Sequence, residues 1–344
     1  MPASLRTPLA RQLGRSVALS STAAAAVLAV ALITSGGGPA AAGVPVDAGG
    51  HAHGGGYGTE QEGGAAPDKE APVLQDSPLD PEQATALVVQ QNAQVSGEFR
   101  SDCATSHRGP DDPIVYPGQP SATQLHDFFG NRTTNATSSE ESLLAGMSNC
   151  APAADHSAYW VSTLYQDGQP VAPELVTALY QGVTSPADAV AMPAGLKYLI
   201  GNSRAAGPEQ NPASRWTCAG LPEQHRSFPV CPPGTKLTLR LDFPTCWDGE
   251  RTDSPDHRDH LKYPTGATCP DSHPKALPRL SLVVTYPVNG PGVTLAGLRD
   301  GLRQIDGAAF TVRGGFLNAW EPGELERRVT GCVNVGRVCG PEGR

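Results

Sequence analysis

Eight cysteines place the strongest constraint on what this 344-residue chain can fold into. None belongs to a Cys-x-x-Cys pair, so their spacing does not indicate a zinc ribbon or a thioredoxin-like motif. An even number of cysteines in an exported chain predicts a framework of disulfide bonds. Because short loops close with the least loss of entropy, we expect each cysteine to pair with its neighbour in the sequence. The expected pairs are Cys103–Cys150, Cys218–Cys231, Cys246–Cys269 and Cys332–Cys339.

Residues 1–42 have the pattern of a signal peptide. Three arginines precede an uncharged apolar run at 17–34, and the small residues Ala40-Ala41-Ala42 follow it. This pattern predicts cleavage after Ala42 and a secreted protein. The alternative is a membrane anchor that stays uncleaved, because the apolar run is about long enough to span a bilayer.

Composition divides the rest of the chain. Residues 43–78 are rich in Gly, Ala and Pro and have no periodic apolar pattern, which predicts a disordered linker. Residues 79–96 are expected to form a short helix or more linker, since Asp80 can cap a helix and Pro81 suits its first turn. All the cysteines and tryptophans lie beyond this point, so we expect one domain over residues 97–344.

Short strand-like segments between Pro and Gly turns predict the fold class of that domain. Residues 236–243 alternate strictly, and residues 158–165, 279–288 and 308–318 are rich in aromatic or β-branched side chains. Helices are expected only at residues 173–181 and near the C-terminus. The pattern is typical of a mainly β, disulfide-bonded sandwich or jelly-roll-like single domain with few short helices.

The charge of the chain bears on its partners. Removing the three arginines of residues 1–42 changes the formal net charge from −9 to −12. An acidic chain without a basic stripe repels phosphate backbones, so nucleic acid is not an expected partner. A membrane is expected as a partner only if the signal segment stays uncleaved, and the sequence does not indicate an oligomeric state.

Two polar clusters are candidates for a functional site. In the first, His126 and Asp127 stand beside two phenylalanines, and a histidine next to an acid can act as an acid, a base or a metal ligand. The second cluster, residues 248–260, would be closed into a loop by the bond from Cys246 to Cys269, which could preorganise a polar site. Both clusters have a structural alternative, in which the polar groups only hold their loops.

Four sequence strings carry a resemblance to a known family. The strings DDPIVYPGQP, AYWVSTLYQDG, FPTCWDGERTDSPDHRDHLKYP and FLNAW resemble the family called domain of unknown function 1996, over residues 103–332. That family is secreted in actinobacteria and fungi and is sometimes joined to carbohydrate-associated modules. The resemblance therefore implies export and a cell-wall or polysaccharide context.

The chain departs from the family pattern at two positions. The family often has a second histidine where this chain has Gln124, and His-Gly-Asp or His-Ala-Asp where this chain has Arg313-Gly314-Gly315. If those groups act in other members, the resemblance implies that this chain has lost or changed the activity.

The sequence leaves four functions open. The first is a hydrolase or lyase acting on extracellular polysaccharide, with catalytic candidates Asp127, Asp248, Asp256 and His257. Its candidate substrate-binding residues are Trp160, Trp247, Asn131 and Arg313. The second is a non-catalytic module that binds a glycan or the cell wall. The third is a divalent metal site built from His126, His257, His260 and His273. The fourth is a purely structural role for both clusters.

Overall fold

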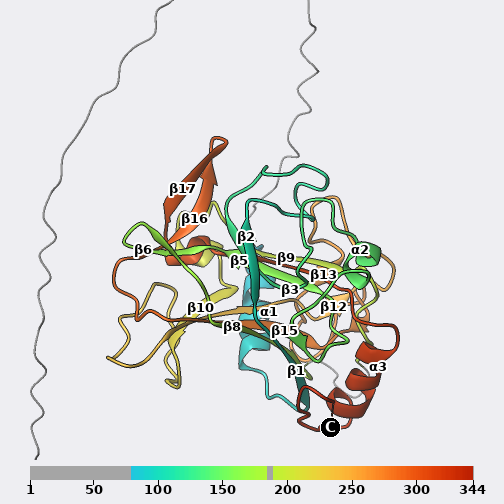
Figure 1. The fold of residues 1–344 in the computed structure, drawn as a ribbon. Helices are drawn as coiled ribbons and strands as arrows, with labels where there is room; N and C mark the ends of the chain where they lie inside the picture. Colours follow the sequence, from blue (N-terminus) through green and yellow to red (C-terminus); the bar gives the residue numbers. More distant parts are fainter. Residues whose placement is uncertain (1–78, 184–188, 344) are drawn as a thin grey trace, which may run out of the picture. The chain divides into compact units, whose positions relative to one another are not determined.

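The computed structural model describes residues 79–183 and 189–343, which form a mainly β fold (Figure 1). The expected signal segment, its cleavage point and the linker at 43–78 lie outside the described residues. No helix of the described part is long and apolar enough to cross a membrane. The predicted class, mainly β with few short helices and with disulfide bonds, is confirmed.

Two large sheets form the body of the fold. The first has six strands in the order β10-β11-β15-β8-β1-β4, and the second has five in the order β2-β3-β5-β18-β9. The six strands are β1 (Glu98–Cys103), β4 (Cys150–Ala151), β8 (Leu175–Gln181), β10 (Ser214–Cys218), β11 (Leu237–Asp242) and β15 (Arg279–Tyr286). The five strands are β2 (Thr105–Gly109), β3 (His126–Gly130), β5 (Ala158–Ser162), β9 (Lys197–Gly201) and β18 (Arg313–Leu317).

Two smaller sheets and a few short helices complete the described part. A four-stranded sheet contains β6 (Leu164–Gln166), β7 (Gln169–Val171), β16 (Val293–Arg299) and β17 (Leu302–Gly307). A three-stranded sheet contains β12 (Cys246–Trp247), β13 (Leu261–Lys262) and β14 (Lys275–Ala276). The helices are α1 (Pro81–Asn92), α2 (Glu140–Leu144) and α3 (Glu324–Arg328), with 3-10 turns at Pro208–Gln210 and Ala309–Thr311 and a π-helical turn at Val329–Val333.

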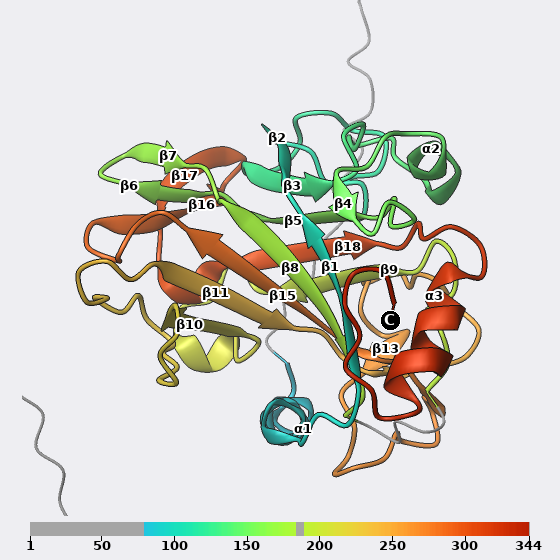
Figure 2. The same ribbon diagram turned by 60° about the horizontal axis from the view of Figure 1, so that its bottom comes forward.

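The two large sheets pack face to face as a sandwich (Figure 2). The hydroxyl groups of Tyr159 on β5 and Tyr180 on β8 meet in the interface at 2.7 Å, and Tyr159 also donates to the buried carboxylate of Asp155. The rings of Tyr198 on β9 and Phe243 after β11 pack edge to face, with centroids 5.3 Å apart. The main hydrophobic core therefore lies between these sheets.

The five-stranded sheet is buried on its outer face as well. Strands β3, β5 and β18 have no exposed residue, and a second hydrophobic cluster covers the face opposite the main core. This cluster includes Phe128 and Trp160 from the sheet, Ile114 from the loop before β3, and Leu143 from α2. Burial on both faces explains the nearly continuous apolar run of β5.

Two segments differ from their expected structure. Residues 173–181, expected as a helix, contain strand β8, because β1 and β15 pair with it on both sides. The single strand expected at 158–165 is interrupted at Thr163, so that β5 and β6 belong to different sheets.

The disulfide bonds join the cysteines in the sequential order expected from short-loop closure. Cys103 and Cys150 are direct partners on the β1–β4 ladder, so this bond fastens the edge strand β4 to the six-stranded sheet. The bond from Cys246 to Cys269 closes the loop that carries the second polar cluster.

A buried charge cluster lies on the outer face of the six-stranded sheet. The carboxylate of Asp242, fully buried, accepts from Arg215 and from Arg240. Arg279 donates to the backbone carbonyl of Gln90 and so ties this face to α1. Burial alone would raise the pKa of Asp242, but the charges of Arg240, Arg215 and Arg279 together hold it below its usual value.

We expect Asp242→Asn to lower the free energy of unfolding by about 3–5 kcal/mol, because it leaves buried arginines without their counter-charge. Since the folded state lowers the pKa of Asp242, this stabilisation is present above the unfolded pKa and is lost as pH falls through the folded value. Urea unfolding at several pH values measures both effects. The control is Glu174→Gln, which breaks the exposed pair with Lys236 and should cost no more than about 1 kcal/mol. Equal losses for the two variants would contradict the structural role of Asp242.

Candidate functional site

His126 and Asp127 do not form one site, although they are neighbours in the sequence. Alternation along β3 places them on opposite faces of the five-stranded sheet. His126 is level with Ser162 on the outer face, whereas Asp127 is level with Val161, which belongs to the main core. Asp127 accepts from Arg108 at 2.7 Å, and burial raises its pKa to about 6. The expected acid–histidine pair is therefore not present.

The acids of the disulfide-closed loop hold the loop itself. Asp248 accepts from the backbone N–H groups of Glu250 and Arg251 and from the Arg251 side chain at 2.6 Å. Asp256 accepts from the hydroxyl of Ser254 and from two backbone N–H groups that follow it. Turn formation accounts for these contacts, so the structure offers no paired carboxylates here for acid–base hydrolysis.

The histidines of the same region are also engaged. His257 contacts Asp253 at 2.8 Å, and His260 lies between the Ser254 hydroxyl and the backbone carbonyl of Lys197. His273 donates to the carbonyl oxygen of Asp259 at 2.7 Å. These contacts connect the loop to β9 and to its own backbone, as the structural alternative predicts.

The expected four-histidine metal site is not formed. Among the residues that the structure describes, only Cys103, Cys150 and Asp155 bring three ligand-type atoms within 4.8 Å of one another. The two cysteines are bonded to each other, so they are not available as thiolate ligands. His126 lies on β3, apart from the loop that holds His257 and His260.

Three of the expected substrate-binding residues have structural positions. Trp160 is fully buried in the second hydrophobic cluster, and Asn131 is fully buried with its amide donating to the carbonyls of Leu143 and His156. Trp247 is half-buried and donates to the backbone carbonyl of Arg251. Neither Trp160 nor Asn131 lines any of the cavities described below. The fourth residue, Arg313, has a different position.

Gln124, His126 and Arg313 converge on the outer face of the five-stranded sheet, and we call them the Gln124–His126–Arg313 site. Ser162 joins them, because its hydroxyl accepts from the Gln124 amide at 2.6 Å and from the backbone N–H of Arg313 at 3.0 Å. His126 is the direct ladder partner of Ser162. Nothing in the sequence singles out Ser162, whereas the resemblance described above draws attention to Gln124 and Arg313.

Each of the three side chains has a polar atom without a hydrogen-bond partner among the described residues. The atoms are Gln124 Oε1, His126 Nε2 and Arg313 Nε. The exposed fractions of these residues are 0 %, 0 % and 3 %. Buried polar atoms normally have partners, so three such atoms on neighbouring residues mark this place as a candidate binding site.

The protonation of His126 defines what the site presents. Its Nδ1 lies 3.0 Å from the backbone carbonyl of Asp111, which can only accept, so Nδ1 carries the proton and Nε2 presents a lone pair. Burial lowers the pKa of His126 to about 4, while Asp112 opposes this shift and Arg313 adds to it. With the His126 ring neutral, the site offers two acceptors, Gln124 Oε1 and His126 Nε2, and one donor on a charged group, Arg313 Nε.

A cavity connects this site to an open groove. The cavity is lined by Gln124 and Arg313 but not by His126, and its volume of about 10 Å³ is about what one water molecule needs. It shares Ser203, Arg204 and Leu298 with a wider groove of about 1120 Å³, counted out to open solvent. The groove lies beside the hairpin of β16 and β17, which projects from the rest of the fold in Figure 1.

The hairpin also positions the loop above the site. Arg303 on β17 donates to the backbone carbonyls of Thr123 and Ser121, at 2.9 and 2.6 Å. Thr123 in turn accepts from the Arg313 guanidinium at 3.1 Å. The groove wall and the base of the cavity are thus connected through one loop.

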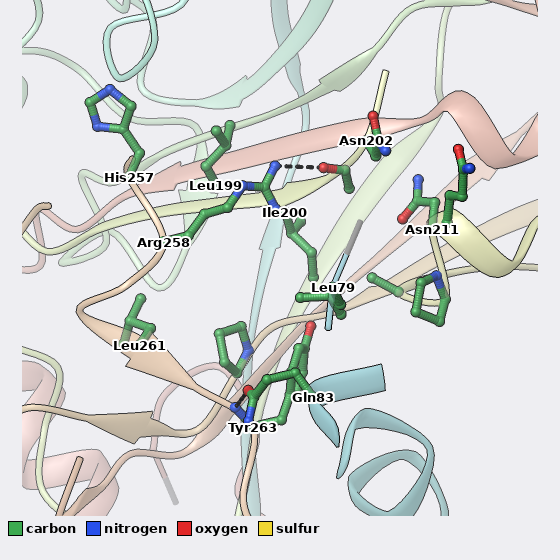
Figure 3. Close-up of a pocket in the computed structure, with 15 residues that line it drawn as sticks. Leu79, Gln83, Leu199, Ile200, Asn202, Asn211, His257, Arg258, Leu261 and Tyr263 are labelled. Atoms are coloured by element: carbon green, nitrogen blue, oxygen red, sulfur yellow. Dashed lines mark hydrogen bonds between the residues drawn. The ribbon is translucent and has the colours of Figure 1, made fainter. Parts of the chain in front are cut away.

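A separate pocket lies along the edge of β9 (Figure 3), with a volume of about 50 Å³. Its polar groups are engaged with the protein: Gln83 accepts from the backbone of Tyr263, and Arg258 donates to the carbonyl of Gly201. The ring of His257 points away from the other lining residues. The pocket wall is mainly apolar, and the candidate residue His257 lies here, away from the Gln124–His126–Arg313 site.

We expect His126 to remain neutral at all pH values well above about 4, because burial disfavours its charged form. Proton NMR of the ring should show no titration near 6.5 in the folded chain and a normal titration in urea. Because the unfolded state takes up the proton first, the contribution of His126 to stability should fall as pH drops from 6.5 toward 4. The control His126→Gln should remove that part of the pH dependence. Titration near 6.5 in the folded chain would contradict the geometry of the site.

Comparison with known proteins agrees with the resemblance seen in the sequence. A family model described as Domain of unknown function (DUF1996) matches residues 112–320, a span that includes Gln124, His126 and Arg313. No curated protein and no solved structure matches the chain. The family match covers more than half of the sequence, and the chain therefore belongs to the DUF1996 family.

Proposed function

We propose that this chain is an exported protein that binds extracellular polysaccharide at the Gln124–His126–Arg313 site. The observation that carries the proposal is the group of three unpartnered, buried polar atoms, of which those of Gln124 and Arg313 belong to residues that line a small cavity beside a groove. Sites of this kind, concave with a few convergent polar groups, are the usual places where proteins bind small or extended ligands.

Sugar hydroxyls suit the atoms that the site presents. A hydroxyl can donate to Gln124 Oε1 or His126 Nε2 and can accept from Arg313 Nε. Leaving such a buried atom unpaired costs about 1–3 kcal/mol, so a ligand that pairs it gains both affinity and selectivity. The groove beside the hairpin provides room for the rest of an extended chain.

The disulfide bonds support the exported part of the proposal. Four of them join eight cysteines, and no cysteine of the described residues is free. Such bonds persist in oxidising compartments and are rare where thiols are kept reduced. The signal-like pattern of residues 1–42 points the same way.

Affinity electrophoresis of the full chain against a panel of soluble polysaccharides tests the proposal. At least one should be retained, and Gln124→Leu should weaken its binding about five- to tenfold, the effect of losing one hydrogen bond. Gln166→Leu is the matched control, because it makes the same change at a half-buried strand position away from the site. Retention of no polysaccharide would exclude the function, and undiminished binding by Gln124→Leu would exclude the site.

A further inference from the structure

We infer that three arginines on the outer face of the six-stranded sheet bind a phosphate or sulfate group. They are Arg226, Arg215 and Arg240, and we call them the arginine row. They lie on a different sheet from the proposed polysaccharide site, so this inference does not rest on the proposed function.

The register of the sheet places the three arginines side by side. Arg215 on β10 is the direct ladder partner of Arg240 on β11. Beyond β10 the chain folds back along it, and Trp216 and His225 exchange both of their backbone hydrogen bonds at 2.8 Å, so Arg226 is level with Arg215. Alternate residues of β11 are leucines of the main core, which leaves the row on the opposite, outer face. The three arginines come from separate segments, so the sequence shows no basic stripe.

The arginine row carries more positive charge than its surroundings neutralise. One carboxylate, the fully buried Asp242, accepts from both Arg215 and Arg240, and no other acid of the described residues forms an ion pair with the row. Burial lowers the pKa of Arg226, the charge of Arg215 lowers it further, and Asp242 opposes both effects. Three guanidinium groups thus share one carboxylate, which leaves an excess of two positive charges. Like charges directly opposite each other on a sheet are destabilising unless something neutralises them.

The fourth arginine of the charge cluster does not reduce this excess. Arg279 donates to the Gln181 side chain and to the backbone carbonyl of Gln90, and the charge of Glu98 favours its charged form. The charges of Arg279 and Glu98 cancel each other, so the excess stays with the arginine row.

Each arginine of the row has N–H donors that no described residue accepts. Arg215 Nε is buried and lacks a partner, and the residue is 7 % exposed. Arg226 donates only from Nη1, to the backbone carbonyls of Pro212 and Ser214. Arg240 donates from Nε and Nη2, which leaves Nη1. Arg226 and Arg240 are partly exposed, so an anion can reach these donors from solvent.

The excess charge and the free donors indicate the class of ligand. A guanidinium group suits a phosphate or sulfate group, because its planar set of N–H groups can donate two parallel hydrogen bonds to the oxygens. A doubly charged anion matches an excess of two charges, whereas a carboxylate would neutralise half of it. The chain as a whole has a formal net charge of −9 and repels long polyanions, so the attraction is local to the row.

Thermal unfolding of the full chain in phosphate and in chloride, at equal ionic strength, tests the inference. An anion that binds the folded chain raises the melting temperature by mass action. At ten times its dissociation constant from calorimetry, inorganic phosphate should raise the melting temperature by about 3–5 °C over chloride. Equal melting temperatures in the two anions would overturn the inference.

The variant Arg226→Gln removes one excess charge and keeps an amide that can donate to the same carbonyls. It should bind inorganic phosphate about tenfold more weakly, the effect of losing one charge-assisted hydrogen bond. The matched control is Arg100→Gln on the same sheet, which breaks an exposed pair with Asp102 and should leave phosphate binding unchanged. If Arg226→Gln does not fold, Arg226→Lys keeps the charge without the planar group and should weaken phosphate binding by a smaller factor.

A purely structural role of Arg226 has a different outcome. Arg226→Gln would then lower the melting temperature equally in both anions and keep the full effect of phosphate, which would overturn the inference. Affinity electrophoresis against dextran sulfate and neutral dextran identifies the source of the anionic group. Retention by dextran sulfate alone, lost in Arg226→Gln, assigns the row to a group carried on a polymer. Phosphate binding without such retention assigns it to a free ion.

Discussion

Burial of the five-stranded sheet on both faces is the constraint on which the candidate site depends. The main core covers one face, and the loop before β3 together with α2 covers the other. Polar side chains on the covered face, such as His126 and Arg313, must then find partners in a nearly dry environment. Most of their polar atoms do so through Ser162, Asp112 and nearby backbone groups. The few polar atoms that lack a partner mark the candidate site, because leaving a buried polar atom unpaired costs free energy.

The two polar regions of the fold differ in how completely they are satisfied. Around Asp248 and His260, side-chain groups pair with the loop backbone, with each other or with β9, so the region stabilises its own shape. Around Gln124 and Arg313, some buried polar atoms have no hydrogen-bond partner among the described residues. The many acids and histidines in the sequence therefore identified a loop that stabilises its own shape. The candidate site was identified from buried polar atoms without hydrogen-bond partners in the structure. Whether a buried polar atom has a partner cannot be predicted from the sequence.

Much of the fold could be predicted because it follows from local pattern. Alternation at 236–243 and the β-branched run at 279–288 became β11 and β15, and Asp80 caps α1 as expected. The prediction was wrong where the same apolar residues fit both the two-residue period of a strand and the 3.6-residue period of a helix. In β8, Val176, Ala178 and Tyr180 face the core at a spacing of two, but the apolar residues of 175–180 also suit one face of a helix. Similarly, adjacency of His126 and Asp127 suggested a pair, although a strand sends neighbours to opposite faces. Which face each residue occupies depends on sheet partners that are distant in the sequence.

Gly315 limits which residues this part of the five-stranded sheet can accept. A side chain at this position would overlap the indole ring of Trp160, which lies across the glycine on the covered face. An aspartate therefore cannot be introduced at this position by one substitution, because the indole would have to move first. A histidine in place of Arg313 would in turn leave Asp112 buried without its cation. Each of these single substitutions is thus destabilising, so the residues at 313 and 315 can change only together with Asp112 and Trp160.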